Sequence, residues 1–157
     1  MSEIKYVKGD ATVPNGRGKK VITHICNDQG GWGAGFVVAI SKRWPYPEHA
    51  YRELFDKRAD QAKLGFVQFI HVDPNIFVAN MIAQHAYGYN EGPPIRYDAV
   101  RTCLEKVAEY AIEEKASVHM PRIGCGLAGG RWEEIEPIIN ETLIAKGLEV
   151  TVYDFGN

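Results

Sequence analysis

Two glycine-rich segments have the composition and placement of phosphate-binding loops. The first, at residues 27–35, reads Asn-Asp-Gln-Gly-Gly-Trp-Gly-Ala-Gly and lies between an apolar strand pattern and a helical pattern. The second, at residues 121–130, reads Pro-Arg-Ile-Gly-Cys-Gly-Leu-Ala-Gly-Gly and has the same placement. Glycines let the backbone approach a ligand closely, and a helix N-terminus offers unpaired N–H groups with partial positive charge. Together the two loops predict a site for a diphosphate at the carboxyl ends of strands.

Other phosphate motifs fit the chain poorly. A glycine cluster taken alone is also typical of a plain tight connection between a strand and a helix. The first loop matches the opening of the dinucleotide fingerprint G-x-G-x-x-G, but Phe36 stands at its third glycine position. That side chain would block the close helix packing which the fingerprint requires. The chain has no G-x-x-x-x-G-K-[ST] segment, which excludes the P-loop kinases and ATPases.

A few titratable or polar side chains at strand ends could support hydrolysis near these loops. His85 follows a strand pattern and precedes a loop, where it could act as acid or base near neutral pH or orient a water molecule. His24 lies in the middle of an apolar strand pattern, which favours a hydrogen-bonded core residue. Cys125 lies in a loop before a helix, a position that favours a thiolate, although a small packing residue is the alternative. The remaining candidates are Asn27, Asp28, Gln84 and Glu91.

Short β-rich runs alternate with longer segments of helical period, and this alternation predicts an α/β fold. The expected strands span residues 4–7, 20–26, 66–71, 76–81, 117–120 and 149–155, and the expected helices span 34–44, 47–57, 96–115 and 132–146. The runs from Val21 and from Val150 are nearly continuous in apolar residues, as expected of strands that are covered on both faces. Pro137 inside the last helix predicts a kink or a later start. The long loop at residues 86–95 is a candidate lid over the site.

Composition limits the class of protein. A chain of 157 residues predicts a single domain over residues 1–157. The net charge of -2, with Lys and Arg spread along the chain, argues against a duplex nucleic acid as partner. The 3 cysteines show no C-x-x-C spacing and predict neither a disulfide framework nor a zinc site. The sequence requires no metal or cofactor, and without a signal peptide or an apolar membrane span we expect a cytoplasmic protein.

The order and spacing of several motifs resemble a macrodomain over nearly the whole chain. The motifs are Gly9-Asp10, the strand that ends in Cys26-Asn27, the loops at 30–35 and 121–127, and the terminal Val152-Tyr153. Within that superfamily, the strings THICNDQGGWGAG and MPRIGCGL are similar to the branch of terminal ADP-ribose glutamate hydrolases and yeast-type ADP-ribose 1''-phosphate phosphatases. The resemblance implies a three-layer α/β/α sandwich with a central mixed, mostly parallel sheet. It also implies that the ligand is ADP-ribose or its phosphorylated, acylated or protein-linked derivatives.

The resemblance further implies a role for each matching position. Asp10 would accept a hydrogen bond from the adenine exocyclic amine, the Ala11 N–H would bond the ring, and Tyr153 would pack against adenine or the proximal ribose. Asn27 and the backbone of residues 33–36 would hold the distal ribose and a phosphate, and the backbone of residues 123–127 would wrap the diphosphate. The implied binding residues are Gly9, Asp10, Ala11, Cys26, Asn27, Gly33, Ala34, Gly35, Phe36, Ile123, Gly124, Cys125, Gly126, Leu127 and Tyr153. From the residues alone, Asp10 also fits a turn cap and Tyr153 also fits a core aromatic.

Two departures from the family pattern bear on catalysis. In the glutamate hydrolases of this branch, catalysis is attributed to a lysine after the fourth strand and an aspartate just after the G-C-G-L loop. Gln84 and Ala128 stand at those places here, and a glutamine cannot form a Schiff base with an opened ribose. We therefore expect hydrolysis of a phosphate, an acyl ester or a protein side chain from the distal ribose, by water held by Asn27 and His85. The alternatives are a non-catalytic ADP-ribose reader, which the loss of the lysine and aspartate favours, and an unrelated nucleotide-binding α/β domain that prefers NAD or ATP.

Overall fold

The computed structural model describes residues 3–86 and 92–155. Over these residues the strands are β1 (Lys5–Lys8), β2 (Lys20–Asn27), β3 (Val67–Asp73), β4 (Ile76–Gln84), β5 (Ser117–Met120) and β6 (Val150–Asp154). The α-helices are α1 (Phe36–Arg43), α2 (Tyr46–Lys57), α3 (Tyr97–Glu114) and α4 (Trp132–Thr142), and short 3₁₀ turns span Ala59–Gln61 and Ile144–Lys146.

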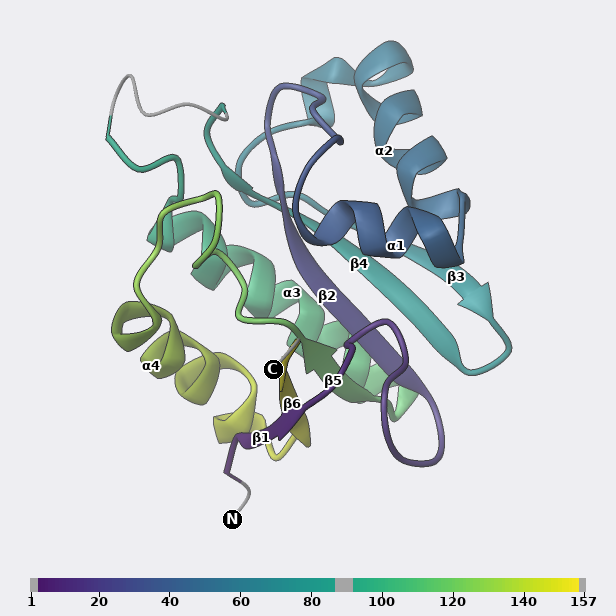
Figure 1. The fold of residues 1–157 in the computed structure, drawn as a ribbon, viewed down its shortest axis with the longest axis vertical. Helices are drawn as coiled ribbons and strands as arrows, with labels where there is room; N and C mark the ends of the chain where they lie inside the picture. Colours follow the sequence, from purple (N-terminus) through teal and green to yellow (C-terminus); the bar gives the residue numbers. More distant parts are fainter. Residues whose placement is uncertain (1–2, 87–91, 156–157) are drawn as a thin grey trace.

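The six strands form one sheet in the order β1-β6-β5-β2-β4-β3. Every neighbouring pair is parallel except β3 and β4, which are antiparallel. Helices α1 and α2 cover one face of the sheet, and α3 and α4 cover the other (Figure 1). This arrangement confirms the expected three-layer α/β/α sandwich with a mixed, mostly parallel sheet.

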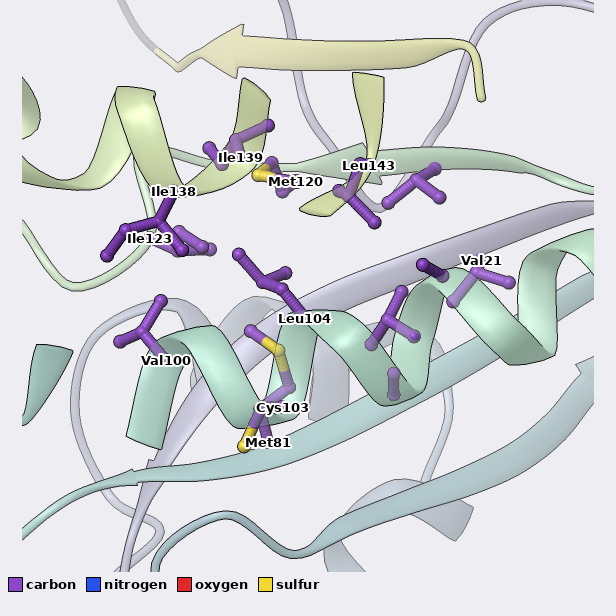
Figure 2. Close-up of a cluster of buried hydrophobic side chains, with 14 of the residues drawn as sticks. Val21, Met81, Val100, Cys103, Leu104, Met120, Ile123, Ile138, Ile139 and Leu143 are labelled. Carbon is purple, nitrogen blue, oxygen red and sulfur yellow. The ribbon is translucent and has the colours of Figure 1, made fainter. Parts of the chain in front are cut away.

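The larger core lies between the sheet and helices α3 and α4 (Figure 2). The helical spacing read from the sequence holds, because Val100, Leu104 and Val107 of α3 are completely buried there. A second core lies on the other face of the sheet, under α1 and α2, and strand β2 contributes to both. Val21 packs toward α3 and α4, while its neighbour Ile22 packs toward α1 and α2. Burial on both faces is the reason that this strand is almost continuously apolar.

Several element ends differ from the sequence expectation. Helix α1 begins at Phe36 rather than at residue 34, because Gly35 has a φ of 82° and an extended ψ that no helix accommodates. Helix α4 starts at Trp132, as its expected range gave, so of the two effects considered for Pro137 the later start does not occur. It ends at Thr142 before a 3₁₀ turn rather than at residue 146. Strand β4 continues to Gln84, which carries that side chain to the edge of the sheet where the site lies.

Part of the predicted lid lies outside the described residues. Residues 87–91, which include Gly88 and Glu91, belong to that part, so the candidate role of Glu91 rests on the sequence alone. No helix within residues 3–86 and 92–155 is long and apolar enough to cross a membrane. The same residues contain no group of three or more His, Cys, Asp or Glu that could hold a metal ion.

Candidate functional site

The expected binding segments meet at one edge of the sheet. Strands β1, β6, β5, β2 and β4 run parallel, so their carboxyl ends share this edge. Along it follow, in order, the turn after β1 with Asp10, the end of β6, the second glycine loop after β5, the first glycine loop after β2, and Gln84 at the end of β4. Segments from distant parts of the chain therefore form a linear track about five strands wide.

Two adjoining cavities lie along this track. The inter-loop cavity, of about 200 Å³, is walled by Gly35 and Phe36 at the start of α1 and by residues 121–124 and 126–128 of the second loop. The first-loop cavity, of about 650 Å³, is lined by Asn27, the glycines and tryptophan of the first loop, and Arg52 of α2. The two cavities share the lining residues Ile25, Ala34, Val37, Gln84 and Leu127. They therefore form one continuous depression that could hold an extended ligand.

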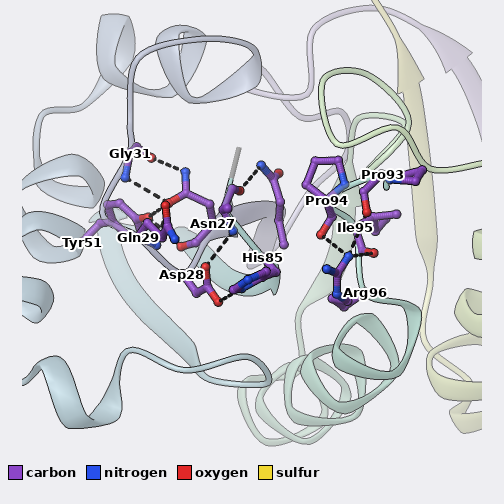
Figure 3. A network of polar contacts seen from close by, with 12 residues as sticks. Asn27, Asp28, Gln29, Gly31, Tyr51, His85, Pro93, Pro94, Ile95 and Arg96 are labelled. Atoms are coloured by element: carbon purple, nitrogen blue, oxygen red, sulfur yellow. Dashed lines mark hydrogen bonds and ion pairs between the residues drawn. The ribbon is translucent and has the colours of Figure 1, made fainter. Parts of the chain in front are cut away.

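The Asn27 side chain holds the first loop in place through hydrogen bonds to the loop backbone (Figure 3). Its Oδ1 accepts hydrogen bonds from the backbone N–H groups of Gln29 at 2.9 Å and Gly31 at 3.0 Å, and its Nδ2 donates to the Gly31 carbonyl at 2.9 Å. The buried Tyr51 hydroxyl of α2 lies 2.7 Å from the Asn27 carbonyl and 2.9 Å from its Oδ1. The side chain thus fixes the loop, and since Nδ2 has one acceptor among the described residues, its second hydrogen can serve a ligand in the first-loop cavity.

Asp28 and His85 form a polar pair at the ends of β2 and β4 (Figure 3). The Asp28 Oδ2 lies 2.8 Å from His85 Nδ1, and its Oδ1 accepts from the Ala86 N–H at 2.8 Å. The carboxylate can therefore orient the imidazole as in other acid–base pairs. Among the described residues that line the two cavities, Gln84 is present and His85 is not. A catalytic role for His85 stays a prediction.

The second loop is shaped by its glycines and reaches across to the first loop. The Gly130 N–H donates to the Gly124 carbonyl at 2.6 Å, and the Gly129 N–H donates to the Gly126 carbonyl at 3.0 Å. Leu127 is 65% exposed, and its Cδ1 would lie 3.4 Å from a side-chain carbon added at Gly35. This leucine therefore bridges the two loops over the inter-loop cavity.

Cys125 does not have the thiolate character that its loop position suggested. Burial raises the pKa of its thiol, and the charge of Arg122 offsets this only in part. The thiol form is therefore favoured at neutral pH. The structure supports the alternative interpretation of Cys125 as a small residue in a tight loop.

At the β1 end of the track, the two residues expected at adenine also have structural roles. The Asp10 Oδ1 accepts from the Thr12 N–H at 2.8 Å and from the Thr12 hydroxyl at 2.7 Å, which is a turn cap. Tyr153 is only 2% exposed, and its hydroxyl accepts from the Asn15 N–H at 2.8 Å and lies 2.8 Å from His119 Nδ1. In this structure Tyr153 is thus a buried aromatic with an engaged hydroxyl.

Phe155 was not selected from the sequence as a ligand-binding residue. It follows the end of β6 and is 81% exposed. Because Lys8 pairs with Asp154 in the sheet register, Phe155 lies level with Gly9, beside the turn that holds Asp10. The period of two in a strand was the available signal, since it places Phe155 on the same face as Tyr153 but beyond the last pairing.

Arg122 anchors the start of the second loop and was also missed. Its Nε and Nη2 donate to the two carboxylate oxygens of Asp154 at 2.8 Å and 3.0 Å. Its guanidinium carbon lies 4.9 Å from the ring centroids of both Tyr6 and Trp132. The bidentate hydrogen bond lowers the pKa of Asp154. The loop is thereby tied to β6, to the edge strand β1 and to α4.

His24 lies beneath the inter-loop cavity and is 1% exposed. Its Nε2 lies 2.6 Å from Asn80 Oδ1, while Asn80 Nδ2 donates to the Pro47 carbonyl at 3.1 Å. Because a carbonyl can only accept, this contact fixes the amide orientation and assigns the imidazole proton to Nε2. Burial lowers the pKa of His24 to about 4, so the ring is neutral at neutral pH. The predicted core role of His24 is confirmed.

Two solved structures share this fold over nearly the whole chain. A protein of unknown function from Bacteroides thetaiotaomicron is 60% identical with a TM-score of 0.94, covering 98% of this chain and 98% of that chain. A macrodomain protein from Streptomyces coelicolor is 54% identical with a TM-score of 0.88, covering 98% of this chain and 100% of that chain. No protein-family model matches the chain.

Curated relatives differ in how much of their length the chain spans. The chromodomain-helicase-DNA-binding protein 1-like of Mus musculus is 34% identical over 98% of this chain, which spans only 18% of that protein. The corresponding protein of Danio rerio is spanned over 15% of its length. The ADP-ribose 1''-phosphate phosphatase of Candida albicans is 28% identical, covering 88% of this chain and 92% of that protein.

Proposed function

The chain belongs to the macrodomain family, and on that premise we propose that it binds ADP-ribose and hydrolyses a substituent on the distal ribose. The supporting observation is the order of groups along the edge of the sheet. A carboxylate and an exposed aromatic ring lie at one end, two phosphate-type loops face each other in the middle, and a larger cavity lies at the other end. ADP-ribose has the same order of parts, with adenosine, diphosphate and ribose in a line.

The β1 end offers complementary groups for adenine. One oxygen of Asp10 is engaged by Thr12, and the second oxygen can accept from the adenine exocyclic amine while the Ala11 N–H bonds the ring. We assign the stacking role to Phe155 rather than Tyr153, because Phe155 presents its ring to solvent and the Tyr153 ring is covered. The adenine contact that the resemblance implied for Tyr153 is thereby reassigned to Phe155, two residues further along the chain and just past the end of β6.

The inter-loop cavity suits the diphosphate. Helix α1 starts at its wall, and its first turn contains no acidic side chain that would repel an anion. The N–H groups at the start of that turn and those of the second loop can donate to phosphate oxygens from opposite sides. The distal ribose would then lie in the first-loop cavity, beside Asn27 and Gln84.

Two candidate functions share this binding mode. Hydrolysis is supported by the name of the Candida albicans relative and by the Asp28–His85 pair, in which His85 directly follows Gln84 of the cavity lining. A non-catalytic reader is favoured by Gln84 and Ala128, which stand where the glutamate hydrolases have their catalytic lysine and aspartate, and by the internal hydrogen bonds of Asn27. Assays of phosphate, acyl and protein-linked ADP-ribose substrates separate the two, because a reader binds ADP-ribose and releases product from none of them.

Replacement of Asp10 tests the binding site itself. Asp10→Asn keeps an oxygen for the Thr12 turn but presents an amide N–H to the adenine amine, which is also a donor. We expect calorimetric affinity for ADP-ribose to fall about tenfold, the effect of losing one hydrogen bond to a charged group. Native protein should prefer ADP-ribose over AMP, ATP and NAD.

The matched control for that variant is Thr12→Val, which removes a hydroxyl bonded to the same carboxylate but leaves the charge in place. It should bind ADP-ribose with near-native affinity. If native protein binds ADP-ribose no better than AMP, or if Asp10→Asn binds normally, the proposed site is wrong.

A second pair of variants decides which aromatic residue stacks on adenine. Phe155→Ala is expected to weaken binding of both ADP-ribose and AMP by about tenfold, because base–aromatic stacking contributes roughly 1–3 kcal/mol. Tyr153→Leu removes the ring together with the hydroxyl that bonds Asn15, and because that ring is covered the change should lower thermal stability more than affinity. Calorimetry with AMP measures the effect without the rest of the ligand. The opposite ranking of the two variants would return the adenine contact to Tyr153.

A further inference from the structure

We infer that Arg52 makes this site selective for an anionic substituent on the distal ribose, of which a phosphate monoester is the chemical class that fits best. The inference rests on the proposed function, and it narrows the three substrate classes given above to one. It concerns recognition of the substituent and assigns no part in bond cleavage to Arg52.

Arg52 is the one charged side chain among the described residues that line the first-loop cavity. The other lining residues are the glycines and apolar side chains of the first loop and its surroundings, together with the neutral amides of Asn27 and Gln84. An anion in this cavity would thus meet a single fixed cation and no carboxylate. Because the Arg52 side chain is 50% exposed, it lies at the mouth, where a ligand group can reach it without being fully desolvated.

A closed chain of hydrogen bonds holds the guanidinium in place. Arg52 Nε donates to Glu48 Oε2 at 2.9 Å, and Arg52 Nη2 approaches the Trp32 carbonyl at 3.4 Å. The other Glu48 oxygen accepts from the Ser41 hydroxyl at 2.8 Å, and Ser41 accepts from Trp32 Nε1 at 2.8 Å. This series of hydrogen bonds begins and ends on Trp32, which itself lines the cavity.

These hydrogen bonds hold the Arg52 guanidinium in position but leave part of it available to a ligand. Arg52 Nη1 has no partner among the described residues, so its hydrogens remain for the oxygens of an incoming anion. The hydrogen bond from Ser41, followed by that from Arg52, lowers the pKa of Glu48 and keeps its carboxylate ionised. Glu48 itself does not line the cavity. A guanidinium held in place by other hydrogen bonds is a group that proteins commonly use for phosphate oxygens.

The position of the cavity defines which part of the ligand it meets. It adjoins the inter-loop cavity on the side of β2 and β4, at the opposite end of the track from Asp10. A group attached to the distal ribose would therefore enter it. A phosphate monoester gains from Arg52, an uncharged acyl ester gains little, and a guanidinium-linked ADP-ribose is repelled.

The test compares two ligands that differ only in the substituent, ADP-ribose and ADP-ribose 1''-phosphate. Trp32 lines the cavity, so stopped-flow fluorescence can give association and dissociation rate constants on the millisecond scale, before turnover. Native protein should bind the phosphorylated ligand about tenfold more tightly, the effect expected of one hydrogen-bonded charge pair. Arg52→Gln should remove this preference and leave ADP-ribose affinity within about twofold. Arg52→Lys, which keeps the charge without the fork, should retain part of it.

Arg58→Gln is the matched control, since it removes the same charge from an exposed position just after α2, away from both cavities. It should keep the native preference. Two results would overturn the inference and leave the proposed function standing. In one, native protein binds ADP-ribose and ADP-ribose 1''-phosphate equally well, and in the other, Arg52→Gln still prefers the phosphorylated ligand. A native protein that does not bind ADP-ribose overturns both.

Discussion

Acidification from pH 7 to pH 4 is expected to lower the free energy of unfolding by about 6 kcal/mol through two buried histidines, roughly 3 kcal/mol for each. The pKa values of His24 and His119 are lowered from 6.5 to about 4 in the folded protein, in both cases chiefly because burial penalises the charged ring. Below pH 6.5 the unfolded chain takes up protons at these positions and the folded chain does not. The stabilisation is therefore fully present above pH 6.5 and is lost as the pH falls toward 4.

The surroundings of the two rings explain why neither can easily accept a proton. His24 packs edge-on against Trp32, with ring centroids 5.5 Å apart, and against Phe36. His119 lies between the Tyr153 hydroxyl at 2.8 Å and the Ser117 hydroxyl at 2.7 Å, and the charge of Lys20 opposes a second cation nearby. Within residues 3–86 and 92–155, neither ring contacts a carboxylate that would stabilise its charged form.

Urea unfolding at several pH values between 7 and 4 measures this effect. His24→Gln and His119→Gln should each have a lower free energy of unfolding than native protein at pH 7. In each variant, however, the drop in that free energy between pH 7 and pH 4 should be about half of the native drop. His71→Gln, which replaces an exposed histidine, should show the full native drop. If the loss begins only below about pH 4.5, it would instead come from carboxylates such as Glu48 and Asp154, whose lowered pKa values stabilise the fold at higher pH.

The fold could be predicted largely because its signals are local in sequence. Strand β5 was predicted at its observed bounds, and the helical spacing of α3 identified its buried face. The glycines of both loops could be located because each cluster falls between a strand pattern and a helical pattern, where glycine marks a connection. The end of α4 was misjudged because hydrophobic period alone cannot tell an α-helical turn from the 3₁₀ turn that precedes Gly147.

The residues that were missed depend on contacts between distant segments. Arg52 reaches the first loop because its neighbour Tyr51 bonds the backbone of Asn27, and no pattern in α2 reveals this. Arg122 gains its role from Asp154, thirty-two residues away, and from two aromatic rings on other elements. Side-chain partners of this kind are set by topology, which sequence periodicity does not encode.

Gly124→Ala is expected to lower the free energy of unfolding by roughly 3 kcal/mol and to abolish ADP-ribose binding in the micromolar range. Gly124 has a φ of 73°, which strains any residue with a side chain. A methyl group there would lie 2.2 Å from the Ile95 Cδ1, with Ile135 and Ile25 closing the other sides at 3.1 Å and 3.2 Å. Because Ile95 is buried, its side chain cannot move away freely, and the second loop must shift.

Gly126→Ala in the same loop separates the loop's structural role from its proposed binding role. Gly126 has no positive φ, and a methyl group there would meet no atom within 4 Å, so urea unfolding should give a near-native free energy. The methyl group would nevertheless stand beside the inter-loop cavity that Gly126 lines, and it should weaken ADP-ribose binding by obstructing the diphosphate. Equal stability of native protein and Gly124→Ala would contradict the packing argument. Tight ADP-ribose binding by Gly126→Ala would instead place the diphosphate elsewhere, because only a ligand outside the inter-loop cavity would be indifferent to that methyl group.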